Sequence, residues 1–441
     1  MRSGSPHRGF VKSAESPIPA SVISVAVGTQ VAVSMVQQGL PSISIPLQRD
    51  LHVGLAGLGI VLGAANAATA ASVYAWGRWS DRVGDRRVLS AGLLVAVPGL
   101  VAAGVAASSG YRAPTIAGLL VAGVGVGAGT AALARALADR VPARRLGAVL
   151  GLRQAAVPVG GLVAAALLPI AADLAGVGAA FDVLGLACAV AVLGVAFGLP
   201  ASPQSGSPSS EGAPVATAPT PNPARPVGFP ALLAANACYC VAQTGAVALS
   251  MAAWHTAIGV GVTPAVLMFI AVQSGSGVLR VGLGRAGDRR PDQEPVFLIF
   301  LGACTAALLA MLALAHAARL PVGLQAGLLL AACLPAGGWN GLAFAVSTRL
   351  AVLTGNRHRL GHIHGLQNTV LFTAVGLTPP ALTAVAAWAG WALCWALLAA
   401  CAAAGALIHA LSSASFTCPV PQSTARQESP VCVSPAPTTS S

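Results

Sequence analysis

The sequence predicts an all-α membrane protein with twelve transmembrane helices, arranged as two six-helix bundles with pseudo-two-fold symmetry. Three observations support this prediction: the chain is 56% apolar and only 8% charged, it contains twelve apolar runs of spanning length, and two motifs recur at similar offsets. Soluble domains carry about 25% charged residues, because their surface faces water. A chain with so few charges is better suited to a surface that faces hydrocarbon.

The twelve apolar runs are each long enough to cross the hydrocarbon core, which requires about 20 mostly apolar residues. The first six cover about residues 20–46, 53–76, 88–108, 114–137, 147–170 and 178–199. The second six cover about residues 229–256, 263–283, 295–317, 321–347, 361–384 and 387–411. The boundary between the fifth and sixth runs is the least distinct, because residues 171–182 contain only two charges.

The composition between and beyond the runs predicts the domain organisation. Residues 200–228 are rich in Pro, Ser, Ala and Gly, so we expect a flexible cytoplasmic linker between an N-terminal bundle at 19–199 and a C-terminal bundle at 229–411. We expect residues 1–18 and 412–441 to form cytoplasmic tails, the second of them disordered. The N-terminus lacks a short apolar run with a small-residue cleavage site, which indicates that the first span is retained.

The distribution of basic residues predicts that both termini lie on the cytoplasmic side of the cell inner (plasma) membrane. With the N-terminus inside, 19 of the 24 Lys and Arg residues fall in cytoplasmic segments and three, Arg49, Arg112 and Arg319, fall in outer loops. This asymmetry follows the positive-inside rule, which also explains the net charge of +12 without a nucleic-acid partner. The other two, Arg153 and Arg280, fall inside spans, and we expect Arg280 to reach the cytoplasmic rim.

Two pairs of motifs indicate an internal duplication. G-R-x-x-D-R occurs after the second run, from Gly77, and after the eighth, from Gly284. R-L-G-x-x-x-G-L begins at Arg145 and again at Arg359, at the starts of the fifth and eleventh runs. The offsets are 207 and 214 residues, so both pairs fit one duplicated six-helix unit. An even number of spans per unit keeps both copies in the same orientation, which predicts parallel halves.

At these motifs the chain resembles the major facilitator superfamily, whose loop after the second span reads G-x-x-x-D-R-x-G-R-[KR]. The matching residues are Gly77, Asp81, Arg82 and Gly84. Asp85 stands where the family has a base, and Arg86 and Arg87 restore the positive charge. The resemblance covers about residues 19–411 and implies a secondary active or facilitative transporter. Residues 153–169 and 366–380 are similar to the cyanate-permease-like branch.

The loop motif also predicts a conformational latch. Its glycines allow a tight turn and close helix approach, and its aspartate can pair with an arginine and cap a helix end. Such a latch would hold the cytoplasmic side closed until the two halves move. The resemblance implies this role for Gly77, Asp81, Arg82, Gly84 and Arg86 and for Gly284, Asp288 and Arg289 in the second copy. A simple positive-inside loop is the alternative.

Arg153 is the strongest candidate for binding a solute. An ionisable group inside a span is costly and usually faces a cavity, and the guanidinium fork suits a carboxylate or another oxyanion. An arginine that extends to the inner headgroups is an equal alternative. The other polar candidates are Gln154, Gln367 and Asn368, at matching positions of the repeat, and Gln30, Gln37, Asn236 and Gln243 in the first and seventh spans.

The remaining patterns predict a transporter without a cofactor. No G-x-x-x-x-G-K-[ST] motif is present, and the nine cysteines are scattered without metal-ligand spacing. No clustered nucleophiles in the spans indicate an enzyme, and no deep carboxylate supports proton coupling. We expect a monomer in the lipid bilayer that takes a small, anionic or strongly polar solute. Efflux of hydrophobic compounds and a non-transporting receptor or scaffold are the alternatives.

Overall fold

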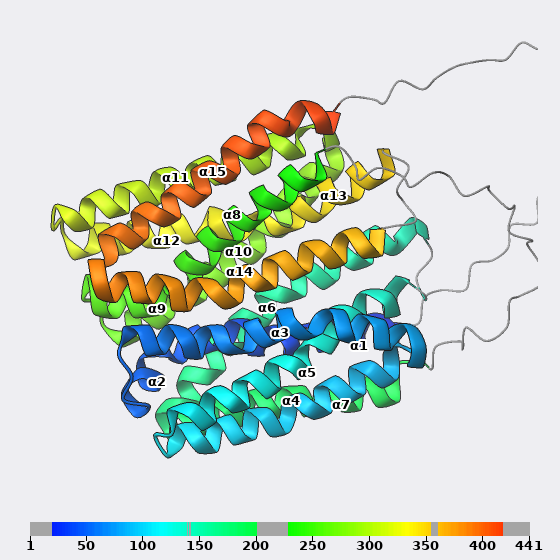
Figure 1. Ribbon diagram of the computed structural model, residues 1–441, viewed down its shortest axis with the longest axis horizontal. Helices are drawn as coiled ribbons and strands as arrows, with labels where there is room; N and C mark the ends of the chain where they lie inside the picture. The colour runs from blue at the N-terminus through cyan, green and yellow to red at the C-terminus, as the bar shows by residue number, and fades with distance from the viewer. Residues whose placement is uncertain (1–19, 139, 141–142, 201–227, 354–359, 418–441) are drawn as a thin grey trace, which may run out of the picture.

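The computed structural model describes residues 20–138, 140, 143–200, 228–353 and 360–417. In this part of the chain, twelve helical segments are long and apolar enough to cross a membrane, which confirms the expected all-helical membrane fold. Figure 1 shows two halves side by side, the N half in blue to teal and the C half in green to red. The linker expected at 200–228 and the N-terminal tail expected at 1–18 lie almost wholly outside the described residues.

The N half contains six spans. The first consists of α1 (Ala20–Gly39), the 3-10 turn η1 (Leu40–Ile43) and α2 (Ser44–Asp50). The others are α3 (Leu55–Val83), α4 (Asp85–Ser108), α5 (Arg112–Ala138), α6 (Ala143–Ala175) and α7 (Val177–Gly198). Gly176, with φ of 83°, separates α6 from α7, because a left-handed residue interrupts the helix at the boundary that the charge pattern left indistinct.

The C half repeats this order. Its first span consists of α8 (Phe229–Ala248), α9 (Ser250–Ala252) and the π-helical turn η2 (Ala253–Ile258). The others are α10 (Val262–Arg289), α11 (Glu294–Ala317), the pair α12 (Val322–Gly338) and α13 (Asn340–Leu353), α14 (Leu360–Ala389) and α15 (Trp391–Thr417). Helix α15 continues past Leu411, where we expected the disordered tail to begin.

Small residues let the helices within a half approach closely. A Cβ added to Gly118 on α5 would lie 2.7 Å from the backbone nitrogen of Ala103 on α4, and one added to Gly125 would lie 2.6 Å from that of Ala96. Only a residue without a side chain fits at such contacts, which are typical of helix packing in membranes. The glycine-rich run of the fourth span is therefore a packing face.

The two halves meet at the end of the molecule opposite the start of α1 and the end of α15, which we call the far end; the other is the terminal end. Helix α3 packs against α14 from the far end to the middle of both helices: a Cβ on Gly59 would lie 2.5 Å from the carbonyl oxygen of Pro379, and one on Gly376, near the middle of α14, would lie 2.7 Å from Cα of Ala67. Helix α9 also contacts α2 and η1, at the left of Figure 1. These contacts close the molecule at the far end.

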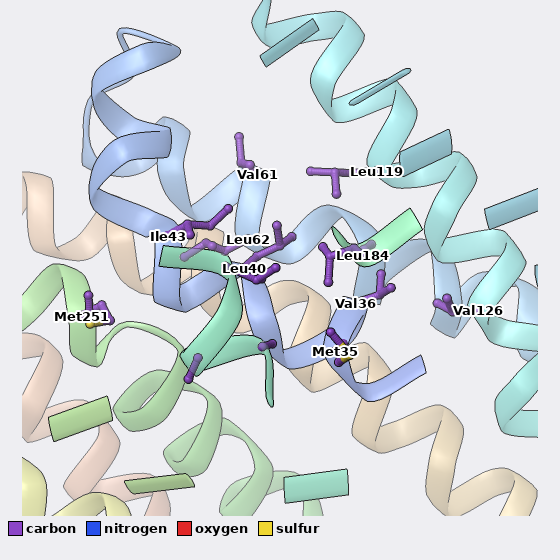
Figure 2. Close-up of a cluster of buried hydrophobic side chains, with 14 of the residues drawn as sticks. Met35, Val36, Leu40, Ile43, Val61, Leu62, Leu119, Val126, Leu184 and Met251 are labelled. Atoms are coloured by element: carbon purple, nitrogen blue, oxygen red, sulfur yellow. The ribbon is translucent and has the colours of Figure 1, made fainter. Parts of the chain in front are cut away.

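The hydrophobic core shows the same asymmetry between the two ends. One continuous core includes the N half and the far end of the C half; Figure 2 shows part of it, with Leu40 and Ile43 of η1 and Met251 of α9. The terminal end of the C half has a separate core, which includes Phe229 and Leu350. Burial of apolar surface therefore joins the halves at the far end, whereas the described residues at the terminal end of the C half form a buried cluster of their own.

Candidate functional site

A cavity of about 150 Å³ lies between the two halves. The N half contributes residues of α1, η1, α3, α5 and α6: Gln30, Gln37, Gln38, Pro41, Leu62, Asn66, Thr130, Arg153, Gln154 and Val157. The C half contributes residues of α8, α10, α13 and α14: Cys240, Gln243, Thr244, Val247, Ala248, Phe269, Gln273, Arg280, Asn340, Phe344, Asn368, Leu371, Phe372, Val375 and Pro379. No aspartate or glutamate is among these described lining residues.

Arg153 on α6 is the charged centre of the N-half wall. Its side chain is buried, with 7% exposed, and its Nη1 donates a hydrogen bond to Oε1 of Gln30 at 3.0 Å. Gln30 Nε2 in turn donates to Ser34 Oγ at 3.1 Å. Nε of Arg153 is buried without a hydrogen-bond partner. A buried guanidinium that has only neutral partners is costly, and an anionic ligand would compensate this cost.

Arg280 on α10 brings a second guanidinium to the cavity. Our expectation that it reaches the cytoplasmic rim was wrong, because its side chain lines the cavity and is only partly exposed. Its Nε donates to the carbonyl oxygen of Gly337 at 2.6 Å, near the break between α12 and α13. Sequence reasoning missed this residue because it lies near the end of its span, although an arginine in an apolar run was the available signal.

Most of the expected polar candidates line the cavity. Gln37, Gln154, Gln243 and Asn368 do so together with Gln30 and Arg153. Asn340 Nδ2 donates to Gln243 Oε1 at 2.8 Å, so the side chain of Gln243 is held in place. Nε2 of Gln37 is buried without a partner. Such amides can both donate and accept hydrogen bonds, so they suit a polar solute.

Gln367 and Asn236 do not line the cavity. Both are fully buried, and all four of their amide nitrogen and oxygen atoms lack a hydrogen-bond partner. One helical turn further along the same two helices, Cys240 Sγ contacts the carbonyl oxygen of Leu371 at 3.4 Å, which places Gln367 and Asn236 near each other between α8 and α14. They therefore lie behind the cavity wall.

The C-half wall contains three aromatic rings that the N-half wall lacks. They belong to Phe269 on α10, Phe344 on α13 and Phe372 on α14. Sequence reasoning could not single them out, because an apolar residue in an apolar span carries no signal of which face it occupies. The cavity thus combines a polar N-half wall with a partly aromatic C-half wall, which is the usual composition of a small-molecule site.

The structure shows a tight turn at the expected latch. Gly84, with φ of 87°, separates α3 from α4, as its place in the motif predicted. Asp81 and Arg82 are exposed, as are Asp288 and Arg289 in the second copy. A Cβ on Gly77 or Gly284 would have no neighbour within 4 Å, so neither glycine serves a close contact in this structure.

The buried acid of this region is Asp85 rather than Asp81. Asp85 is fully buried and paired with Arg140 at the end of α5, and Arg140 Nη2 also donates to the carbonyl oxygen of Pro200 at 2.9 Å. Arg86 donates to the carbonyl oxygen of Ala196 on α7. These bonds join the terminal ends of α4, α5 and α7 within one half.

The C half contains an equivalent ion pair at its terminal end. Arg349 Nη2 lies 3.3 Å from Glu294 Oε2, so the end of α13 is paired with the start of α11. Asp85 and Glu294 are separated by 209 residues, and so are Arg140 and Arg349. The repeat therefore includes this contact as well as the two sequence motifs.

The comparisons with solved structures agree with this architecture. The chain is similar to a D-xylose–proton symporter, with a TM-score of 0.71 and 14% identity over 89% of this chain and 97% of the other. It is similar to a bacterial homologue of the human lysosomal transporter Spinster, solved in an inward-facing and occupied conformation (TM-score 0.64, 14% identity, 91% and 96%). It is also similar to the human organic anion transporter MFSD10 (TM-score 0.64, 15% identity, 91% and 100%).

The sequence comparisons identify the family. No curated protein matches the chain significantly in sequence. The identities to the solved structures are low, so those likenesses show the fold alone. The family model of the Major Facilitator Superfamily, however, matches residues 27–379, which is most of the chain and includes both halves. The chain therefore belongs to the Major Facilitator Superfamily and is a multi-pass membrane protein of a transporter family.

Proposed function

We propose that this protein is a secondary active or facilitative transporter of a small organic anion, which moves by rocker-switch alternating access between the two halves. The observation that carries the proposal is Arg153, buried in the cavity between the halves, with an unpartnered Nε and no carboxylate among the described lining residues. An anionic group on the solute would supply the missing charge and hydrogen-bond acceptor.

The walls of the cavity favour a solute with both polar and apolar parts. Amides such as Gln37 and Gln154 could bind the polar part, and the rings of Phe344 and Phe372 could cover an apolar part. The resemblance of residues 153–169 and 366–380 to the cyanate-permease-like branch also favours a small anion. We propose that the latch motifs and the terminal-end ion pairs steady the halves as they move, in a monomer with both termini cytoplasmic.

Efflux of a hydrophobic compound is the second candidate, and the three phenylalanines of the C-half wall favour it. The two candidate functions differ in the expected effect of replacing Arg153 on transport. A hydrophobic solute would gain nothing from a guanidinium, so replacing the arginine would leave its transport intact or improve it. An anionic solute would lose its main electrostatic contact.

Transport by the purified protein in proteoliposomes tests the proposal. The probes are radiolabelled benzoate, acetate and succinate, with benzamide and acetamide as uncharged counterparts. We expect one or more of the anions to be transported by the wild type, none by Arg153→Gln, and unchanged transport by Arg290→Gln, an exposed arginine outside the cavity. Transport of the uncharged compounds alone, or anion transport that survives Arg153→Gln, would contradict the proposal.

A further inference from the structure

Arg153 and Arg280 belong to different halves but lie at nearly the same depth. Helices α6 and α10 run in opposite directions and touch across the interface: a Cβ on Gly277 would lie 3.4 Å from Pro158. Arg153 precedes Pro158 by five residues, and Arg280 follows Gly277 by three. Both therefore lie on the terminal side of this contact, at depths that differ by roughly 3 Å at 1.5 Å per residue.

This placement makes the two guanidiniums approach each other when the terminal end closes. The α6–α10 contact lies between the halves, and in a rocking motion the parts on its terminal side move together. Two positive side chains on facing helices then repel each other in a space from which water is being expelled. The described cavity lining offers no carboxylate that would offset this repulsion.

We propose that Arg153 and Arg280 together hold one anionic group of the solute between the two halves, and that closure at the terminal end requires this group. The site takes a carboxylate or a similar oxyanion, because two guanidinium forks present converging N–H donors. Arg153 has an unpartnered Nε, and Arg280 makes a single hydrogen bond, to Gly337, so both retain donors for the anion.

This inference rests on the proposed function for its solute but makes a separate statement about the empty protein. Without an anion, the like charges oppose closure of the terminal end. Removing either charge would then let the halves close without any solute. The prediction concerns conformation only, so it is testable before a transported solute is known.

Hydrogen–deuterium exchange of the purified, ligand-free protein measures the closure. We expect Arg280→Gln to slow exchange in the terminal-end turns of α10 and α13 by about tenfold and to speed exchange in α9 and the start of α3. Arg153→Gln should act in the same direction. Arg280→Lys keeps the charge and Arg290→Gln changes an exposed charge, so both should match the wild type.

Three outcomes decide the inference. Slower terminal-end exchange in Arg280→Gln, with Arg280→Lys unchanged, supports the inference. This holds even if none of the tested anions is transported, because a failure of transport counts against the proposed function and not against the inference. Exchange in Arg280→Gln that equals the wild type overturns it. Equal slowing in Arg280→Gln and Arg280→Lys would also overturn it, because the effect would then come from packing rather than charge.

Discussion

The two halves share one architecture but differ at the cavity. In the N half, Arg153 on α6 is hydrogen-bonded to Gln30 on α1. The repeat-equivalent helices of the C half carry Gln367 and Asn236, which are fully buried and unpartnered, and the second guanidinium comes from Arg280 on α10 instead. The terminal-end ion pairs, in contrast, occupy equivalent positions in both halves. The ion pairs that hold helix ends are thus retained in both copies, whereas the positions of Arg153 and Gln30 have diverged.

The largest expected difference between the halves concerns their ion pairs. Asp85→Asn removes the buried carboxylate that pairs with Arg140, whose side chain is 9% exposed, and should lower the stability by about 3–5 kcal/mol. Glu294→Gln should lower the stability by only about 1 kcal/mol, because the side chain of Arg349 is 29% exposed and its Nη1 also lies 3.9 Å from Asp292 Oδ1. Thermal unfolding in detergent measures both. The double variant Asp85→Asn/Arg140→Gln should recover part of the loss, and equal losses for both single variants would refute the comparison.

The next effect concerns anion affinity. Arg153→Gln should weaken the binding of an anionic solute by about 2–4 kcal/mol, or roughly 30- to 1000-fold in Kd, because the fork to the oxyanion is lost. The Kd of Arg153→Lys should fall between those of the wild type and Arg153→Gln, since the charge remains but the guanidinium fork does not. Gln367→Leu, at the equivalent position of the C half, should leave Kd unchanged. Titration calorimetry checks all three, and a similar loss in Gln367→Leu would mean that the halves contribute equally.

A smaller effect should come from the aromatic wall of the C half. Phe372→Ala removes one ring from the cavity and should weaken the binding of benzoate by about 1–3 kcal/mol. The binding of acetate should be nearly unaffected, because acetate has no apolar part large enough to contact the ring. Leu377→Ala, an exposed position on the same helix, is the matched control. Equal weakening of the two anions would show that Phe372 supports the fold of the cavity and not the apolar part of a solute.

The smallest effect should distinguish the buried amides of the two halves. Gln367→Leu replaces an unpartnered buried amide with an apolar side chain and should raise the stability by about 1 kcal/mol. Gln30→Leu removes the hydrogen-bond acceptor of Arg153 and should lower the stability by about 1–2 kcal/mol. Melting temperatures give both signs directly. A stability loss in Gln367→Leu would indicate that this amide has a partner, such as a buried water.

The spans could be predicted from the sequence because the hydrocarbon core constrains length and polarity together. A run such as 88–108 can hardly be anything but a spanning helix, and the structure places α4 there. Gly84 was also predictable, since a turn between two such helices needs a residue that tolerates positive φ.

The faces of the helices could not be predicted in the same way. Asp81 and Asp85 are four residues apart in one loop motif, and only the turn at Gly84 decides that Asp85 is the one that becomes buried. Arg280 was misplaced because distance from the span end says nothing about which side of α10 faces the other half. Phe269 and Phe372 carry no signal, because their apolar character fits lipid, core and cavity equally well.

Ligand-induced stabilisation tests the central claim, which is that the N-half wall of the cavity binds an anion through Arg153. The melting temperature of the purified protein is measured with benzoate and with benzamide, which differ mainly in charge, for the wild type, Arg153→Gln and Arg290→Gln. The account predicts that benzoate, and not benzamide, raises the melting temperature of the wild type and of Arg290→Gln but not of Arg153→Gln. Equal stabilisation by both compounds, or stabilisation of Arg153→Gln by benzoate, would contradict it.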